Sequence, residues 1–132
     1  MSEDLQTAEQ LDRAKQALRS EYLARRKMIS QEEAEKASHT ICQCLSSFFK
    51  ELQQMIKLDL YNRTVFSYMA YGREINLREL HEELWAQGRL LAVPRTIGLP
   101  QGEMESVYLR ADSQLVKSPL GVWEPSAETA KP

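Results

Sequence analysis

The first half of this chain lacks the residues that interrupt helices. The earliest glycine is Gly72, and all five prolines follow residue 93. Glycine and proline are the strongest local breakers of regular structure. Their absence favours long helices in the first half, whereas the last third is expected to form strands and loops.

Long apolar runs and metal-binding clusters are missing as well. No stretch approaches the roughly 20 apolar residues of a membrane-spanning helix. The opening residues MSEDLQTAEQ are too acidic and polar for a secretory or mitochondrial leader. Cys42 and Cys44 stand two positions apart in a helical pattern, so they point to different faces and form no metal pair. His39 and His81 lie far apart in the sequence, and each is assigned a plain surface or boundary role.

These absences limit the classes of function that the chain can have. We expect no metal site, no membrane association and a reducing, cytoplasmic location. The net charge of −2 argues against a general nucleic-acid binder. No G-x-S-x-G motif, zinc spacing or Walker loop occurs, so no catalytic residue is assigned.

The first predicted helix begins near Thr7, which forms a candidate capping box with Gln10. Lys15 and Arg19 lie four residues apart, so two cations share one helical face and can flank a polyanion. The apolar positions beside them, spaced by three and four, are Leu11, Ala14, Leu18 and Tyr22.

The second predicted helix is capped by Ser30, and Glu33 completes its capping box. Its expected buried face consists of Ala34, Ala37, Ile41, Leu45, Phe48 and Leu52. This periodicity extends over several turns and is typical of an amphipathic helix.

The second half predicts three strands. TVFSYM (Thr64–Met69) is rich in β-branched and aromatic residues, RLLAV (Arg89–Val93) is a short apolar run, and MESVYLR (Met104–Arg110) follows. Between the first two, Asn76 caps a third helix that Gly88 ends. A strand–helix–strand unit predicts a parallel crossover. The fold class is therefore α/β, with a three-layer, mostly parallel sheet flanked by helices.

Two segments lie where such sheets bind ligands, beyond the carboxyl ends of the strands. Glu74 follows the first strand, and Arg95 follows the second. A carboxylate there can accept hydrogen bonds from an aminopyrimidine-like ring, and an arginine can hold a carboxylate or phosphate. Tyr68, Met69 and Tyr71 would supply apolar walls for a flat heterocycle.

Simpler interpretations stay open for the same residues. Glu74 also suits the entry of the third helix, where negative charge favours the helix dipole. Arg95 fits a solvated loop residue, and Met69 fits a core residue. Trp123 fits a hydrophobic latch over the last loop better than it fits a ligand contact.

Taken in order, six segments resemble the 5-formyltetrahydrofolate cyclo-ligase family, also called methenyltetrahydrofolate synthetase. They are the Lys15/Arg19 helix, Ile29–Glu33, the strand end Tyr68-Met69 with its loop to Glu74, Gly88-Arg89 through Pro94-Arg95, the Met104 strand and Gly121–Pro125. The resemblance covers about residues 11–125.

The resemblance implies an ATP-dependent enzyme of one-carbon metabolism. ATP, accompanied by Mg²⁺, would phosphorylate the formyl oxygen of 5-formyltetrahydrofolate. N10 would then attack the activated carbon and phosphate would leave, giving 5,10-methenyltetrahydrofolate. By carry-over, Lys15 and Arg19 bind the ATP phosphates, and substrate-binding residues are Met69, Glu74, Arg95 and Trp123.

The chain departs from the family pattern after Pro125. The family continues with another strand and an R-L-G-x-G-x-G-Y-Y-D stretch, which residues 126–132 do not resemble. We therefore expect residues 1–125 to form a single truncated domain, residues 126–132 to be a disordered tail, and the C-terminal part of the family fold to be missing. A cut sheet leaves an open edge, which predicts a protein partner that covers it.

Two functions follow as alternatives. One is the cyclo-ligase itself, as an incomplete isoform. The other is a non-catalytic helical interaction protein derived from that fold, which the missing Gly-rich segment favours. A basic-helix RNA binder is a weaker third reading, because the net charge is negative and no aromatic platform is evident.

Overall fold

The computed structural model describes residues 2–57, 59–98 and 102–126. Two long helices come first, α1 (Ser2–Lys27) and α2 (Gln31–Met55). A short 3-10 turn, η1 (Leu60–Asn62), leads into the part of the chain that contains the strands. The first residue of α1 precedes the predicted start at Thr7.

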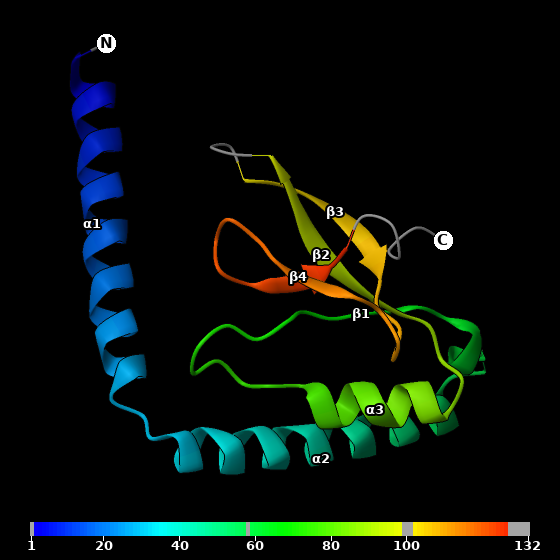
Figure 1. Cartoon of the computed structure of the whole chain (residues 1–132). Coiled ribbons are helices and arrows are strands. Elements are labelled where there is room, and N and C mark those ends of the chain that lie inside the picture. The colour runs from blue at the N-terminus through cyan, green and yellow to red at the C-terminus, as the bar shows by residue number, and fades with distance from the viewer. Residues whose placement is uncertain (1, 58, 99–101, 127–132) are drawn as a thin grey trace.

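Helix α1 stands apart from the rest of the molecule (Figure 1). The apolar residues of its predicted inner face, Leu11, Leu18 and Tyr22, are each more than half exposed. The sequence pattern therefore predicts the helix correctly, but its apolar stripe has no partner among the described residues of this chain.

Helix α2 has the predicted capping box. The Ser30 hydroxyl accepts from the Glu33 N–H, and the Glu33 carboxylate accepts from the Ser30 N–H. Its buried face is rotated from the predicted one, because Cys42 is buried whereas Ile41 and Phe48 are exposed. The buried face of α2 packs against α3. The spacing of apolar residues alone does not show which neighbour a helix packs against.

The main sheet contains β1 (Val65–Phe66), β2 (Leu91–Gly98) and β3 (Glu103–Tyr108) in that order. The pairing of β1 with β2 is parallel, as the crossover through α3 (Arg78–Ala86) predicts. The pairing of β2 with β3 is antiparallel. The α/β class is thus supported, but the mostly parallel sheet is not, because one of the two pairings runs the other way.

The short connection from Gly98 to Glu103 explains why β3 runs antiparallel to β2. A parallel return needs a crossover of a dozen or more residues, whereas a short loop joins antiparallel neighbours. The three-layer arrangement is not confirmed either, because α2 and α3 lie on the same side of the sheet (Figure 1). On the opposite side, Phe66 and Met104 are exposed.

The core lies between this sheet and its two helices. Buried apolar side chains in or next to α2, α3, β2 and β3 form one cluster, which consists of Cys42, Leu77, Leu80, Leu84, Leu91, Val93, Val107 and Leu109. Arg89 is also buried, and its guanidinium donates to the Leu60 carbonyl oxygen at 2.9 Å. This arginine fixes η1 against the strand that follows α3.

A second, two-stranded sheet consists of β4 (Leu115–Lys117) and β5 (Trp123–Pro125) in an antiparallel hairpin that the sequence pattern did not predict. Gly121 has φ +85 at its turn, a conformation that residues with a side chain rarely adopt. Ser126 follows β5 and donates from its backbone to Gln114. The rest of the predicted tail, residues 127–132, lies outside the described residues.

Candidate functional site

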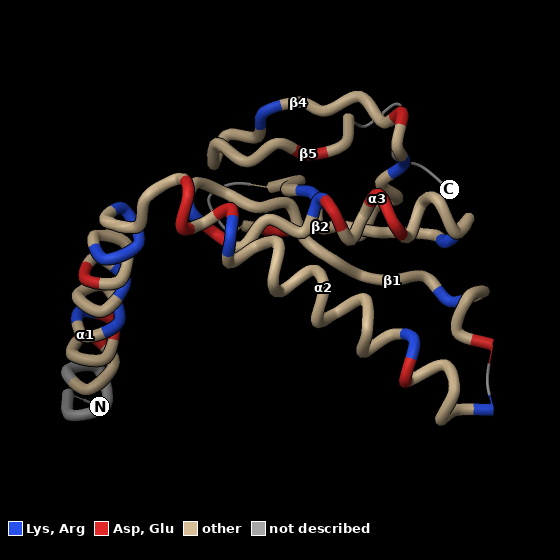
Figure 2. The backbone as a smooth tube through the Cα atoms, turned by 90° about the horizontal axis from the view of Figure 1, so that it is seen from below, with Lys and Arg blue, Asp and Glu red and all other residues tan. Residues whose placement is uncertain are grey.

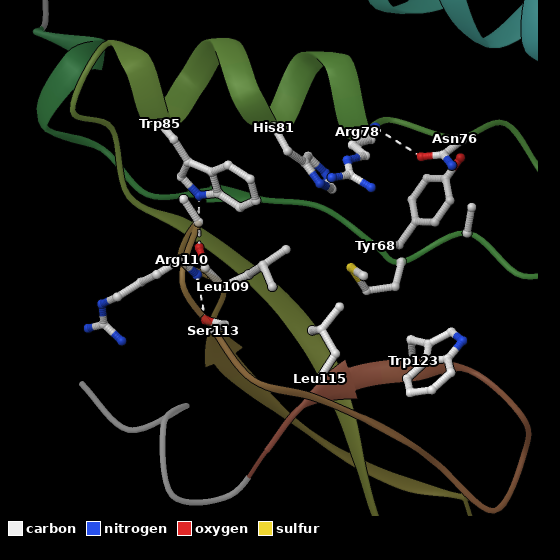
Figure 3. A pocket seen from close by; sticks show the side chains of 13 residues that line it. Tyr68, Asn76, Arg78, His81, Trp85, Leu109, Arg110, Ser113, Leu115 and Trp123 are labelled. Atoms are coloured by element: carbon white, nitrogen blue, oxygen red, sulfur yellow. Dashed lines mark hydrogen bonds between the residues drawn. The ribbon is translucent and has the colours of Figure 1, made fainter.

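A cavity of about 340 Å³ opens where the loop after β1, helix α3, the end of β3 and the β4–β5 hairpin meet (Figure 3). We call it the α3 cavity. Its volume falls within the range of small-molecule sites, which are usually lined by apolar and aromatic groups with a few polar ones. The four contributing segments are far apart in sequence, so only the folded chain creates this site.

The loop after β1 supplies one wall. Met69 and Tyr68 both line the cavity, and the Tyr68 hydroxyl donates to the Ile75 carbonyl oxygen at 2.6 Å. Burial, together with the nearby Glu74 carboxylate, raises the pKa of the Tyr68 phenol. The phenol is protonated at neutral pH, and its hydrogen bond to Ile75 joins the two ends of the loop.

Helix α3 supplies the opposite wall through His81 and Trp85, which are four residues apart and share one helical face. The Trp85 indole N–H donates to the Leu109 carbonyl oxygen at 3.0 Å, which ties the helix to the end of β3. The His81 Nε2 lies 2.7 Å from the Ser67 hydroxyl. Burial lowers the pKa of His81, so its imidazole is neutral at neutral pH.

The β4–β5 hairpin forms the floor, with Leu115 and Trp123 facing the cavity (Figure 3). Aromatic rings and a methionine on opposing walls suit a flat, partly apolar heterocycle. The structure therefore brings two predicted substrate residues together, Met69 from the loop and Trp123 from the hairpin.

Glu74 lies beside this cavity and does not line it. Its carboxylate accepts from the Tyr71 N–H at 3.0 Å, and one oxygen lies 3.4 Å from the Arg26 guanidinium. It lines a second, more open hollow of about 480 Å³. Asn76 and Arg78 line both hollows, so the hollow that contains Glu74 adjoins the α3 cavity.

Arg95 lies within β2 and not in a loop after it. Its Nε donates to the Glu105 carboxylate at 2.9 Å, directly across the β2–β3 ladder. The Arg95 side chain is 23% exposed and does not line the α3 cavity. Its partner in this structure is therefore a carboxylate of the same chain, and its role with substrate stays a prediction.

Lys15 and Arg19 are exposed on α1, and the structure brings neither of them to the α3 cavity or to the hollow beside Glu74. Figure 2 shows α1 directed away from the strands. The last turn of α1 contacts the loop after β1 through the Arg26–Glu74 pair. The predicted nucleotide cations and the predicted substrate residues thus occupy separate parts of this arrangement.

Sequence reasoning missed several cavity residues, of which His81 is the clearest. It was assigned a surface or boundary role, yet its side chain is only 5% exposed. A signal was present, because His81 is four residues from both Leu77 and Trp85 and so falls on the apolar face of α3. Asn76 and Arg78 were missed as lining residues because nothing in the sequence places the β4–β5 hairpin opposite them.

Two features are absent from the part of the chain that the structure describes. No group of three or more His, Cys, Asp or Glu side chains gathers there as a metal-binding cluster. Within the same residues, no helix is both long and apolar enough to traverse a bilayer.

Comparison with known proteins decides the family. A model of the 5-formyltetrahydrofolate cyclo-ligase family matches residues 11–132, which is most of the chain. The chain belongs to that family. No curated protein matches it significantly.

Membership in the cyclo-ligase family confirms the family that the sequence resembles. It supports a ligase-type enzyme function in folate metabolism, with small molecules as substrates. The α3 cavity has aromatic and methionine walls with a few polar groups, which is the composition typical of small-molecule sites.

Proposed function

We propose that this chain acts in the ATP-dependent conversion of 5-formyltetrahydrofolate to 5,10-methenyltetrahydrofolate, and that the reduced pteridine binds in the α3 cavity. The observation that carries the proposal is the meeting of Met69 and Trp123 across one hollow. They come from two segments that resemble the family in sequence, more than fifty residues apart.

The walls provide most of the proposed binding energy. Trp85 and Trp123 offer flat faces to the pteridine ring, and the Met69 thioether adapts to its edge. Glu74 would accept hydrogen bonds from the amino group of the ring once the ligand reaches the boundary between the two hollows. Its present contact with Arg26 is long, at 3.4 Å, so exchanging it for a ligand costs little.

The proposed nucleotide site rests on family membership, since ATP dependence is a property of the cyclo-ligase family. The described residues do not by themselves form a fitting site for ATP and Mg²⁺, because Lys15 and Arg19 lie on α1 away from the α3 cavity. Their proposed role is to hold phosphate groups when α1 packs against a surface that carries the nucleotide. Arg95 would contact the substrate only if its pair with Glu105 opened.

We place the activity in the cytoplasm, because Cys42 and Cys44 are both free thiols and a reducing compartment preserves them. The proposed partners are the folate substrate and ATP, together with a protein that covers the exposed side of the sheet around Phe66. Residues 1–125 are proposed to act as one domain of this enzyme.

Titration of the full chain with 5-formyltetrahydrofolate, with and without Mg-ATP, tests the proposal. Tryptophan fluorescence reports binding, since Trp85 and Trp123 both line the α3 cavity. Trp123→Ala is expected to weaken folate binding, whereas Phe48→Ala is the matched control, because both side chains are 53% exposed. Folate that fails to bind the unmodified chain, or that binds both variants equally, would refute the proposed site.

One observation favours the second candidate function, a non-catalytic helical interaction protein. The apolar stripe of α1, represented by Leu11 and Leu18, is exposed, and the helix itself stands apart from the other described elements (Figure 1). Light scattering and folate titration separate the two functions. Concentration-dependent assembly without any folate binding would support the interaction protein, and folate binding would support the enzyme.

A further inference from the structure

His81 combines features that the folding of α3 alone does not explain. The residue is 5% exposed, yet it lines the α3 cavity among apolar and aromatic neighbours. The Nε2 atom is paired with the Ser67 hydroxyl at 2.7 Å. No described residue forms a hydrogen bond with Nδ1. A buried polar ring therefore keeps one hydrogen-bonding atom unused.

Ser67 is held in place independently of the histidine. Its backbone N–H donates to the Ala92 carbonyl oxygen at 2.8 Å, continuing the ladder between β1 and β2. The hydroxyl is therefore a fixed partner that orients the His81 ring. Figure 3 shows this ring projecting from α3 into the cavity, between Trp85 and Arg78.

An apolar side chain would serve packing better at this position. Among the described residues, Arg89 Nε is the buried side-chain atom without a hydrogen-bond partner, so Nδ1 of His81 is not enclosed and stays accessible from the cavity. The neighbouring inner-face residues Leu77, Leu80 and Leu84 of this segment are indeed leucines. Because Ser67 already orients the His81 ring, Nδ1 is positioned to form a hydrogen bond with a ligand in the cavity.

We propose that His81 is a specificity-determining residue of the α3 cavity, whose Nδ1 forms a hydrogen bond with the polar edge of the bound pteridine while Ser67 positions the ring. This inference rests on the proposed function, since it takes 5-formyltetrahydrofolate as the ligand. A neutral imidazole donates from one nitrogen and accepts at the other. When Ser67 donates to Nε2, Nδ1 carries the proton toward the ligand, and when Ser67 accepts, Nδ1 is the acceptor.

Nitrogen-15 NMR of the histidine rings tests the proposal directly in the full chain. The chain has two histidines, so a His39→Gln variant leaves His81 as the sole ring signal and provides the assignment. His39 is exposed and paired with Glu79 at 2.8 Å, so in the unmodified chain it is an internal control. Adding 5-formyltetrahydrofolate is expected to shift the His81 ring resonances and to leave those of His39 unchanged.

The outcomes separate the two proposals. If tryptophan fluorescence shows folate binding and the His81 resonances do not move, this inference is overturned while the proposed function stands. If folate does not bind at all, the proposed function fails and this inference falls with it. A shift confined to His81 supports both.

Two substitutions add an energetic readout. His81→Phe keeps an aromatic ring but removes both nitrogens, and it is expected to raise the Kd for the folate roughly tenfold, as for one lost hydrogen bond. His81→Asn places an amide near the position of Nδ1 and is expected to restore most of the affinity. Equal affinity of the Phe and Asn variants, with both folded by thermal melting, would contradict a specific hydrogen bond.

Ser67→Ala tests the positioning role separately. Without the hydroxyl, the His81 ring loses the partner that fixes its tautomer. The nitrogen-15 shifts of the free protein are then expected to move toward a mixture of the two tautomers, and folate affinity to fall by less than in His81→Phe. Unchanged ring shifts would remove Ser67 from the proposal.

Discussion

The buried carboxylate of Glu124 holds Thr96 at three points. One oxygen accepts from the Thr96 hydroxyl at 2.9 Å, and both lie 3.2 Å from the Thr96 backbone N–H. β1 pairs with β2 only as far as Ala92, so the carboxylate occupies the edge of β2 that β1 does not reach. This contact holds the β4–β5 hairpin, and with it Trp123, against the main sheet.

Removing this carboxylate is expected to loosen the hairpin. Glu124 is 6% exposed, and Glu124→Ala removes the acceptor of the half-buried Thr96 N–H and hydroxyl. The expected loss is about 1.5–3 kcal/mol of unfolding free energy, as for hydrogen bonds to a charged group. Urea denaturation measures it, with the exposed Glu32→Ala as the control. Equal midpoints for both variants would show that the hairpin is held by other contacts.

Glu74→Gln separates the folate role of Glu74 from its local structural role. The amide oxygen still accepts from the Tyr71 N–H, so the loop is expected to persist. Folate binding is expected to weaken by roughly 1.5–3 kcal/mol, because charge-assisted hydrogen bonds to the ring are lost. Calorimetric titration measures the change, and Arg26→Gln controls for loss of the ion pair. Unchanged affinity would assign Glu74 to loop structure alone.

Lys15 and Arg19 are expected to affect nucleotide binding without affecting folate binding. Neither lines the α3 cavity, so Lys15→Gln and Arg19→Gln should leave the folate Kd unchanged. If α1 supplies phosphate contacts, both changes weaken Mg-ATP binding. Arg13→Gln is the matched control, because it removes the same charge from a different face of α1. Equal loss in all three variants would indicate a net-charge effect only.

Acid is expected to destabilise the fold through His81. Burial lowers the pKa of this group below its ordinary value of 6.5, so the unfolded chain takes up the proton first as the pH falls. The contribution of His81 to stability is therefore complete above about pH 6.5 and declines as the pH falls through the folded pKa.

Urea midpoints measured from neutral to mildly acidic pH check this dependence. The decline is expected to be smaller in His81→Phe, which has no group to protonate there. His39→Gln is the control, because His39 is exposed on α2. A decline that His81→Phe leaves intact would show that other groups cause the acid sensitivity.

The local elements of this chain were largely predictable. The Ser30–Glu33 capping box and the spacing of apolar residues specify α2 through contacts only a few residues apart. The order strand–helix–strand in the sequence also predicted the β1–α3–β2 unit, and the structure confirms that β1 and β2 are parallel. The orientation of β3 was predicted wrongly, although the short connection from Gly98 to Glu103 carried the signal.

The candidate site was predictable only in part. Met69 and Trp123 belong to segments that resemble the family, and the folded chain places both in one cavity. His81 was missed because an isolated histidine, far in sequence from the other one, was assigned a surface or boundary role, and only the folded chain shows that it lines a cavity. The position of Lys15 and Arg19 was not predictable, since exposed charges on a helix do not reveal what the helix packs against.

The sequence by itself determined the family, the long helices and the order of the strands, because motifs, caps and periodicity act over short stretches of chain. Only the tertiary structure decided that the β4–β5 hairpin closes the α3 cavity and that His81 faces into it. Those features depend on contacts such as Thr96–Glu124 and Ser67–His81. Such pairings join positions that are distant in sequence, and no local pattern encodes which partners meet.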